Sequence, residues 1–252
     1  MLNRFIFSAL LVFTFFTGFS QNRIGISATP QFSWLRSDDK KIEGAGSNFG
    51  FRTGIPLELA IGSGGNFFLS TGFNFSFNQG GTIQNGYAKG IYWPESDLSE
   101  ARFDTVFKDA QLTYHVSYFD IPFGVKMLFP SISGNDNIKP YFEFLPSFSF
   151  KMGAKGDIAN TTDRNTEGEN IKQDIQGFAF NLTPGAGVEI ALGDGSAHLG
   201  LGVFYLFQLT DMTKNDDGRV YDTLDPMDGG KQEDARTKAS IFGVRLGLFQ
   251  NF

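Results

Sequence analysis

Residues 240–252 read S-I-F-G-V-R-L-G-L-F-Q-N-F, and this stretch decides the fold class. Counted back from the end, one set of alternate residues is mostly large and apolar: Phe252, Gln250, Leu248, Leu246, Val244 and Phe242. The other set mixes glycine, a charge and an amide: Asn251, Phe249, Gly247, Arg245, Gly243 and Ile241. A repeat of two residues predicts a β-strand whose two faces meet different surroundings.

The same alternation recurs upstream, so the sequence predicts one all-β domain. We expect strands at 23–35, 48–61, 67–78, 112–129, 141–152, 178–192, 197–210 and 240–252. In the fourth of these the phase inverts before Tyr118, because Tyr114 and Val116 are out of step with Phe119 and Ile121. This inversion predicts either a β-bulge or a strand that continues beyond a membrane.

The connections between these segments alternate in length. The short ones, 62–66, 130–139 and 193–196, are rich in turn-forming Gly, Asn, Asp and Ser. The long ones are 37–47, 79–111, 153–176 and 211–236. Bacterial outer-membrane barrels share this asymmetry and an even strand number, and the terminal aromatic Phe252 resembles the end of their closing strand. We therefore expect an eight-stranded antiparallel up-and-down transmembrane β-barrel with short periplasmic turns and long extracellular loops.

The first residues have the composition of a secretory signal. Arg4 is the only charge among them, residues 5–16 are nearly all apolar, and Gly18-Phe19-Ser20 places small residues at the cleavage-determining positions. The predicted division is a signal peptide at 1–20 and a barrel at 21–252. The apolar core of about a dozen residues is short of the roughly 20 that a membrane-spanning helix needs, so a membrane location requires a barrel.

The apolar face of each strand is predicted to point outward, into lipid. An eight-stranded barrel has a bore only just wide enough for side chains to fill, and the roughly forty bulky apolar residues on these strands would not fit inside it. The opposite face consists of Gly, Ser, Thr and Asn with isolated charges, whereas a water-facing surface usually carries far more Lys and Glu. A soluble barrel with an apolar interior is therefore disfavoured.

Charged residues on the inward-facing set predict an interior ion-pair network. They are four acids and four bases: Arg52, Glu58, Asp120, Lys126, Glu143, Lys151, Glu189 and Arg245. Buried charges are costly unless paired, so we expect these groups to neutralise one another and fill the lumen. Folding the fourth strand onto the fifth predicts Lys126 near Glu143 and Asp120 within reach of Lys151. A structural network is favoured, with a gated polar pathway as the alternative.

Residues 118–126, Y-F-D-I-P-F-G-V-K, resemble the approximate motif Y-L-E-I-P-L-x-x-K of the PorT-like family of outer-membrane β-barrels. K-P-Y at 139–141 and G-A-G-V-E at 185–189 resemble two further patterns of that family. The resemblance implies an eight-stranded outer-membrane barrel, in a family whose name-giving member belongs to the type IX secretion machinery. We expect a structural or partner-binding, non-conducting barrel. A component of a type IX-like secretion machinery is the alternative, followed by a small-solute channel or a lipid-modifying enzyme.

The distribution of charge predicts an acidic extracellular surface. The four long connections carry −1, −2, −2 and −4, whereas the rest of the mature chain sums to +2. We expect contacts with outer-membrane lipid and lipopolysaccharide, and through the acidic loops with another envelope protein or, loosely, with Ca²⁺ or Mg²⁺. The sequence has no basic patch of the kind that binds nucleic acid. It contains no cysteine, which excludes disulfides and thiolate metal sites.

Two histidines are candidates for chemistry. His115 lies near the outer end of the fourth strand, with Ser117, Asp109 and Asp120 nearby, so a general base beside a nucleophile is conceivable. His198 starts the seventh strand on the inward face and is predicted to be a hydrogen-bonded lumen residue. We predict no catalytic residue and no enzymatic activity.

Three features lie in the long connections. Tyr92 and Trp93 are candidates for stacking on a sugar or partner, or for anchoring at the membrane interface, which is commoner. Asp97-Leu98-Ser99-Glu100 forms a capping box that predicts a short surface helix. Asp216-Asp217-Gly218 resembles the start of a calcium loop but lacks the bidentate acid at the twelfth position. We predict no cofactor and no dedicated metal site.

Overall fold

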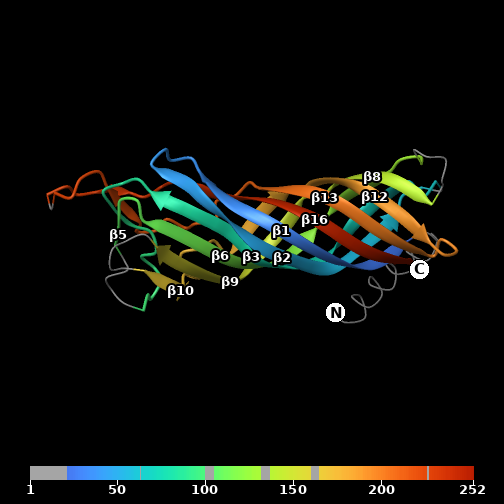
Figure 1. The fold of residues 1–252 in the computed structure, drawn as a ribbon, viewed down its shortest axis with the longest axis horizontal. Helices are drawn as coiled ribbons and strands as arrows, with labels where there is room; N and C mark the ends of the chain where they lie inside the picture. Colours follow the sequence, from blue (N-terminus) through green and yellow to red (C-terminus); the bar gives the residue numbers. More distant parts are fainter. Residues whose placement is uncertain (1–21, 63, 100–104, 132–136, 160–164, 226) are drawn as a thin grey trace, which may run out of the picture.

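The chain folds into a closed antiparallel β-barrel (Figure 1). The structure is a computed structural model that describes residues 22–62, 64–99, 105–131, 137–159, 165–225 and 227–252. In ring order the strands are β1 (Arg23–Ser37), β2 (Ile42–Ala60), β3 (Phe67–Asn85), β6 with β7 (Gln111–Pro122, Gly124–Leu128), β8 with β9 (Ile138–Phe144, Ser147–Ala159), β11 with β12 (Phe178–Leu182, Pro184–Leu192), β13 (Ala197–Gln208) and β16 (Thr237–Asn251). The ring closes where β16 pairs with β1, as Ile24↔Gln250 and Phe32↔Phe242. The predicted eight-stranded up-and-down barrel is confirmed, whereas the predicted signal peptide lies outside the described residues.

Three ring strands are each divided in two by a short break. The breaks fall at Phe123, at Leu145 with Pro146, and at Thr183. The backbone ladder continues across them, because the Phe123 N–H donates to the Pro146 carbonyl and the Leu145 N–H to the Thr183 carbonyl, each at 2.9 Å. Each predicted strand of the ring therefore survives as one wall element.

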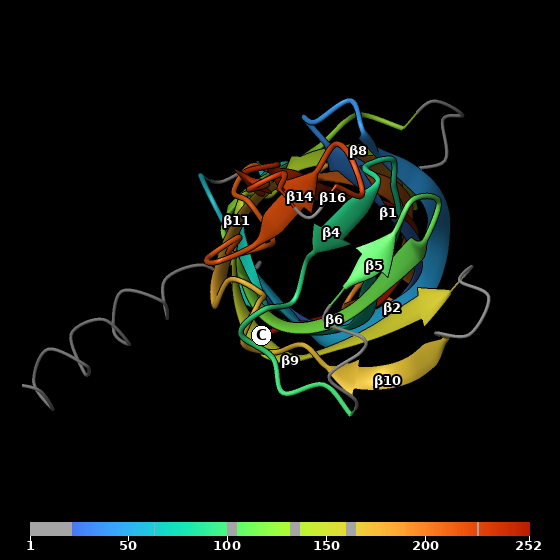
Figure 2. The same cartoon turned by 90° about the vertical axis from the view of Figure 1, so that its left-hand side faces the viewer.

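The two ends of the barrel differ, and we call them the turn end and the loop end. The C-terminus lies at the turn end, while β10 (Thr166–Asn170) lies at the loop end (Figure 1). The long connections also build a four-stranded sheet of β4 (Lys89–Ile91), β5 (Val106–Phe107), β14 (Arg219–Tyr221) and β15 (Lys231–Gln232). Viewed from the loop end, β4 and β14 lie across the opening of the ring (Figure 2). None of the described residues forms a helix long and apolar enough to cross a membrane.

The turn-end part of the wall carries its large apolar side chains on the outside. These exposed side chains form an apolar belt that is rich in phenylalanine: Phe32, Phe49, Phe51, Phe67, Phe73, Phe75, Phe77, Phe123, Phe142, Phe144, Phe148, Phe150, Phe178, Phe207 and Phe242. Several rings pack edge to edge or stack, such as Phe123 on Phe148 at 5.1 Å between centroids. A belt of this size on one continuous surface marks contact with lipid rather than water. The predicted outward direction of the apolar face is therefore what the structure shows.

The loop-end part of the wall has the opposite phase. Tyr114, Val116 and Tyr118 of β6 point inward and are buried, so the phase inversion in the sequence is real. It occurs where the register shifts, between Ser117 and Tyr118 on β6 and between Ser76 and Gln79 on β3. The sequence predicted either a β-bulge or a strand that continues beyond the membrane. Both are present, because the wall bulges at this level and then continues past the apolar belt.

The strands are consequently longer than predicted. β2 begins at Ile42, β3 runs to Asn85 and β9 runs to Ala159, so parts of the predicted connections 37–47, 79–111 and 153–176 are strand. The prediction ended these strands too early because the alternation reverses where lipid gives way to water. Between the belt and the loop end, the barrel has its apolar side chains inside, as a soluble protein does.

Candidate functional site

The lumen near the turn end is filled by a buried cluster of charges. Lys126 of β7 donates to Glu58 of β2 at 2.8 Å and to Glu189 of β12 at 2.7 Å. Arg23 of β1 contacts Glu189 and lies 3.7 Å from Glu58. All four side chains are at most 8% exposed. Two cations and two anions therefore neutralise each other across the bore, on strands far apart in the sequence.

Two more ion pairs occupy the lumen toward the loop end. Arg245 of β16 pairs with Glu143 of β8, and Arg52 of β2 donates to Asp120 of β6 at 2.6 Å. Asp120 is fully buried and also accepts hydrogen bonds from the hydroxyls of Ser76 and Ser149. Its carboxylate is thus satisfied on both oxygens, which is the condition under which a buried charge is tolerated.

The partners within this network differ from the predicted ones. Lys126 and Glu143 do lie opposite each other in the ladder, but the Lys126 ammonium crosses the bore to Glu58 and Glu189. Asp120 pairs with Arg52, not with Lys151. The prediction considered only neighbouring strands, whereas in a narrow bore long side chains reach strands on the far side.

Lys151 lies outside the network, and Arg23 takes its place. The Lys151 ammonium donates to the backbone carbonyls of Lys172 and Ile175, because Lys151 is the last inward position before the phase of β9 inverts. Arg23 is absent from the predicted network, although it is in step with the inward residues Ser27 and Thr29 of its strand. With this exchange the described lumen again holds four acids and four bases.

Little open space is left inside this part of the barrel. A cavity of about 40 Å³ lies among the groups that include Arg52, Glu58, Lys126, Glu143 and Arg245. Such a volume holds only a few water molecules. Large rings also enter the bore from the wall: Phe204 contacts the space that a side chain at Gly243 would occupy, with 2.6 Å to the nearest ring atom. The side chains therefore block this part of the bore.

The loop-end opening is closed by a second, apolar layer, which we call the cap. Its core combines inward residues of the strands with residues of the long connections. The connections contribute Tyr87, Tyr92, Trp93, Val106, Ile171, Ile175, Met212, Val220 and Ala235. Trp93 is 2% exposed and packs edge-on against Tyr114, with 5.5 Å between ring centroids. Gly156 of β9 makes room for this indole, since a Cβ there would lie 2.5 Å from it.

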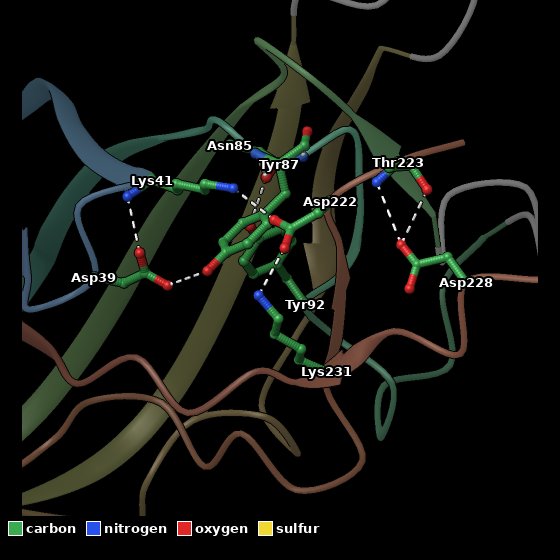
Figure 3. A network of polar contacts seen from close by, with 9 residues as sticks. All are labelled: Asp39, Lys41, Asn85, Tyr87, Tyr92, Asp222, Thr223, Asp228 and Lys231. Atoms are coloured by element: carbon green, nitrogen blue, oxygen red, sulfur yellow. Dashed lines mark hydrogen bonds and ion pairs between the residues drawn. The ribbon is translucent and has the colours of Figure 1, made fainter. Parts of the chain in front are cut away.

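Polar contacts tie three connections together on the outer side of the cap (Figure 3). Asp222 lies between Lys231 and Lys41, at 2.6 and 2.5 Å. Hydrogen bonds from Lys231 and Lys41 lower the pKa of Asp222 to about 2. The Tyr87 hydroxyl donates to Asp39 at 2.6 Å, and Tyr87 also faces the Lys41 ammonium. These contacts join the β1–β2 connection to the segments around β4 and β14.

Two carboxylates hold the segment that follows β4. Asp174 accepts from the Ser96 hydroxyl and from the Glu95 N–H at 3.0 Å. Burial raises the pKa of Asp174, and these hydrogen bonds oppose the effect. Glu169 of β10 accepts from the Ser99 hydroxyl and from the Ser99 N–H at 2.9 Å. The connections are therefore a folded layer with its own buried polar contacts.

These contacts change two sequence interpretations. Tyr92 and Trp93 are buried in the cap, so they neither stack on an external sugar nor anchor at the membrane interface. Alternation cannot distinguish an aromatic that enters a protein core from one that enters lipid. Asp97 begins no helix within the described residues, and Ser99 of the predicted capping box binds Glu169, while Glu100 and the residues up to 104 lie outside the described part.

The histidines are held in local networks. His115 faces outward and its Nε2 lies 2.8 Å from Asp157, while its Nδ1 lies 2.5 Å from the Asn78 amide oxygen. Both ring nitrogens are thus engaged, and neither is directed at Ser117. His198 lies in the lumen with its Nδ1 3.4 Å from Glu189. The described residues contain no group of three or more His, Asp or Glu side chains arranged to hold a metal ion.

A closed ring of antiparallel strands, an apolar belt and a filled bore together define a membrane-spanning β-barrel. The chain belongs to the outer membrane protein beta-barrel domain family, whose model matches residues 8–214. Its location is the outer membrane of the cell, with the loop end extracellular as in other barrels of this class.

Comparison with solved structures gives neighbours of the same class. Neisserial surface protein A is 14% identical with a TM-score of 0.43, and the match covers 92% of this chain and 98% of that one. Ail of Yersinia pestis, solved with the heparin analogue sucrose octasulfate, is 12% identical with a TM-score of 0.33, covering 90% and 98%. The outer membrane protease OmpT of Escherichia coli is 8% identical with a TM-score of 0.37, covering 92% and 96%. No curated protein sequence matches the chain.

Proposed function

We propose that this protein is a non-conducting outer-membrane barrel of the PorT-like type that presents a rigid, acidic extracellular surface to another envelope protein. One observation carries the proposal: the bore is obstructed twice in series, by the ion pairs around Lys126 and by the cap around Trp93. A diffusion channel needs a continuous wet path, and a single obstruction removes it.

The extracellular connections have a fixed conformation, which supports a binding role. Loops that only cover a barrel have no need of buried carboxylates such as Asp174 and Glu169, whose contacts fix the backbone of the neighbouring segment. A fixed surface loses less conformational entropy when a partner binds. Acidic side chains are exposed on it, among them Asp216, Asp217, Asp225 and Asp234, and complementary charge steers association and selects partners.

Planar-bilayer recording tests the closed lumen. The purified mature protein is expected to give no stepwise conductance at moderate voltage. The matched control is a variant shortened by deletion of the segment between β13 and β16, which removes part of the cap but leaves the ion pairs. This control is also expected to stay closed, because the second obstruction is intact. Regular unitary steps from the unaltered protein would contradict the proposal and favour a small-solute channel.

Partner binding is tested by mild-detergent purification from native envelopes with a tag at a position that leaves the loop end free. Co-purifying envelope proteins are expected to be lost when Asp216 and Asp217 are both changed to Asn. Changing Lys40 and Lys238 to Gln alters the net charge by the same amount with the opposite sign and is expected to retain them. Equal recovery from both double variants would contradict recognition through the acidic surface.

Membership of a type IX-like secretion machinery is the second proposal, and it rests on the resemblance of residues 118–126 to the PorT-like motif. In the structure this motif supplies the lumen residues Asp120 and Lys126, which serve the barrel itself. The motif therefore reports on architecture more directly than on a partner. Deletion of the gene followed by a proteomic comparison of secreted proteins separates the two proposals, since only a secretion component produces a broad export defect.

A further inference from the structure

A basic pocket lies on the outside of the barrel wall, directly above the apolar belt. It is formed where β3, β6, β9 and β10 meet, and its polar lining consists of Asn78, His115, Ser117, Lys155, Asn170 and Lys172. Lys155 and Lys172 are exposed, and in the described part of the chain neither ammonium group is paired with a carboxylate.

The side chains at the base of this pocket are held in place by hydrogen bonds. Asn78 adopts a left-handed backbone conformation with φ of 60°, at the register shift of β3. Its amide nitrogen donates to the Phe49 carbonyl at 2.7 Å, which turns its amide oxygen toward His115. The other side of the His115 ring is held by Asp157, whose second oxygen accepts from the Gly168 N–H at 2.7 Å. Asp157 is thus already engaged, and among the described residues that line the pocket the charged side chains are the two lysines.

The height of the pocket places it among lipid headgroups. Met152 and Phe150 are belt residues of β9, and Lys155 follows Met152 by three positions. At about 3.3 Å per residue and a strand tilt of roughly 40°, Lys155 lies about 8 Å beyond the last belt side chain, toward the loop end. The headgroup layer on one side of a bilayer is of about that thickness, since the bilayer measures about 40–45 Å and its hydrocarbon core about 30 Å.

We propose that this pocket binds the phosphate group of a phosphorylated glycolipid in the outer leaflet. Lysine ammonium groups at a membrane surface bind lipid phosphate as point charges. The amide of Asn170 and the hydroxyl of Ser117, which also line the pocket, match the hydroxyls of the attached sugar. Phe77 and Phe150 below them offer an apolar surface for the acyl chains. The same segment of the wall therefore offers phenylalanine rings to the acyl chains, polar side chains to the sugar and lysine ammonium groups to the phosphate.

The site is tested with the full mature chain in a detergent micelle, titrated with bisphosphorylated lipid A and followed by native mass spectrometry. Changing Lys155 and Lys172 to Gln is expected to weaken binding about tenfold or more, because two charge-assisted contacts are lost. Changing Lys40 and Lys238 to Gln removes the same charge elsewhere on the outer part of the barrel and is expected to alter binding less than about twofold. Arg at both 155 and 172 is expected to restore binding, and heat-modifiability confirms that each variant is folded.

Two further probes separate the sources of phosphate. Lipid A stripped of its phosphates is expected to bind like the Gln double variant, and inorganic phosphate is expected to compete only at far higher concentration. Equal binding of phosphorylated and stripped lipid, or an unchanged affinity in the Lys155 and Lys172 double variant, would overturn the proposal. Competition by inorganic phosphate at the concentration of lipid A would overturn the lipid assignment in favour of a free anion.

Discussion

Lys126 and Glu143 face each other across β7 and β8, yet their side chains form pairs with other residues. The Lys126 ammonium lies between Glu58 and Glu189, while Glu143 pairs with Arg245 of β16. The Lys126 ammonium also lies 4.7 Å from the centroid of the Tyr141 ring and 4.6 Å from that of Phe249. A single lysine therefore connects β2, β7 and β12 across the bore, and two carboxylates depend on it.

The first prediction concerns this lysine. Lys126→Met leaves Glu58 and Glu189 with only Arg23 as a cationic partner, so one buried negative charge is uncompensated. Breaking a buried ion pair by removing one partner costs about 3–5 kcal/mol, and we expect a loss of that size in unfolding measured by urea titration in detergent. Lys238→Met, a surface change of the same chemistry, is expected to cost less than about 1 kcal/mol. An unchanged transition in Lys126→Met would contradict the pairing.

The second prediction concerns coupling between Arg52 and Asp120. Each single change, Arg52→Met or Asp120→Leu, strands a buried charge and is expected to destabilise the barrel by about 3 kcal/mol or more. The double variant is expected to be less destabilised than the sum of the two, because neither charge remains, with a coupling energy of about 1–3 kcal/mol. The same cycle applied to Arg52 and Glu189, which do not touch, serves as control. Additive effects in the Arg52–Asp120 cycle would show that the contact contributes little.

The sequence predicted the wall of the barrel because strand and face are local properties. Alternation identifies both from a dozen residues, as in 240–252, and small inward residues reveal a narrow bore. The partners in the lumen depend instead on ring closure: Arg23 and Glu189 are separated by 166 positions and meet only once β1 and β12 share the bore. No local pattern contains that relationship.

The cap was not predicted for a different physical reason. Where the barrel leaves the membrane, the apolar residues change from the outer to the inner face of the wall. A prediction based on alternation therefore ends the strands at Asn78 and Met152. Trp93 then looks like an exposed loop aromatic, although it is 2% exposed. A search for strands that resume with inverted phase would have found residues 79–85 of β3 and 153–159 of β9.

The third prediction concerns the cap and Trp93. Trp93→Ala removes the largest ring of the cap core beside Tyr114, and large-to-small changes of buried aromatics cost about 3–5 kcal/mol. The cap is expected to open more often while the belt-level barrel stays folded. Limited proteolysis is expected to cut the connections of the variant faster, with heat-modifiability unchanged. Phe207→Ala, a belt residue in contact with lipid, serves as control and is expected to leave the proteolysis rate as it was.

The last prediction concerns Glu233, which lies buried beneath the outer side of the cap and accepts the Ala235 N–H at 2.8 Å. Burial raises the pKa of Glu233 to about 7 from an ordinary value of 4.5, and the nearby Asp211 adds to the effect. The folded cap therefore holds this proton more tightly than the unfolded chain does. The contribution of Glu233 to stability is therefore greatest below pH 4.5 and falls as the pH rises toward 7, by at most about 3 kcal/mol at 1.36 kcal/mol per unit of pKa.

Glu233→Gln keeps an acceptor oxygen for Ala235 but carries no charge. At pH 8 its cap is expected to resist proteolysis better than that of the unaltered protein, whereas at pH 5 the two are expected to behave alike. Comparing the two proteins at each pH cancels the pH dependence of the protease. Asp225→Asn, an exposed position on the same connection, is the control and should show no such difference between pH 5 and pH 8. Equal protection of the Gln variant and the unaltered protein at pH 8 would mean that Glu233 does not hold a proton within the cap.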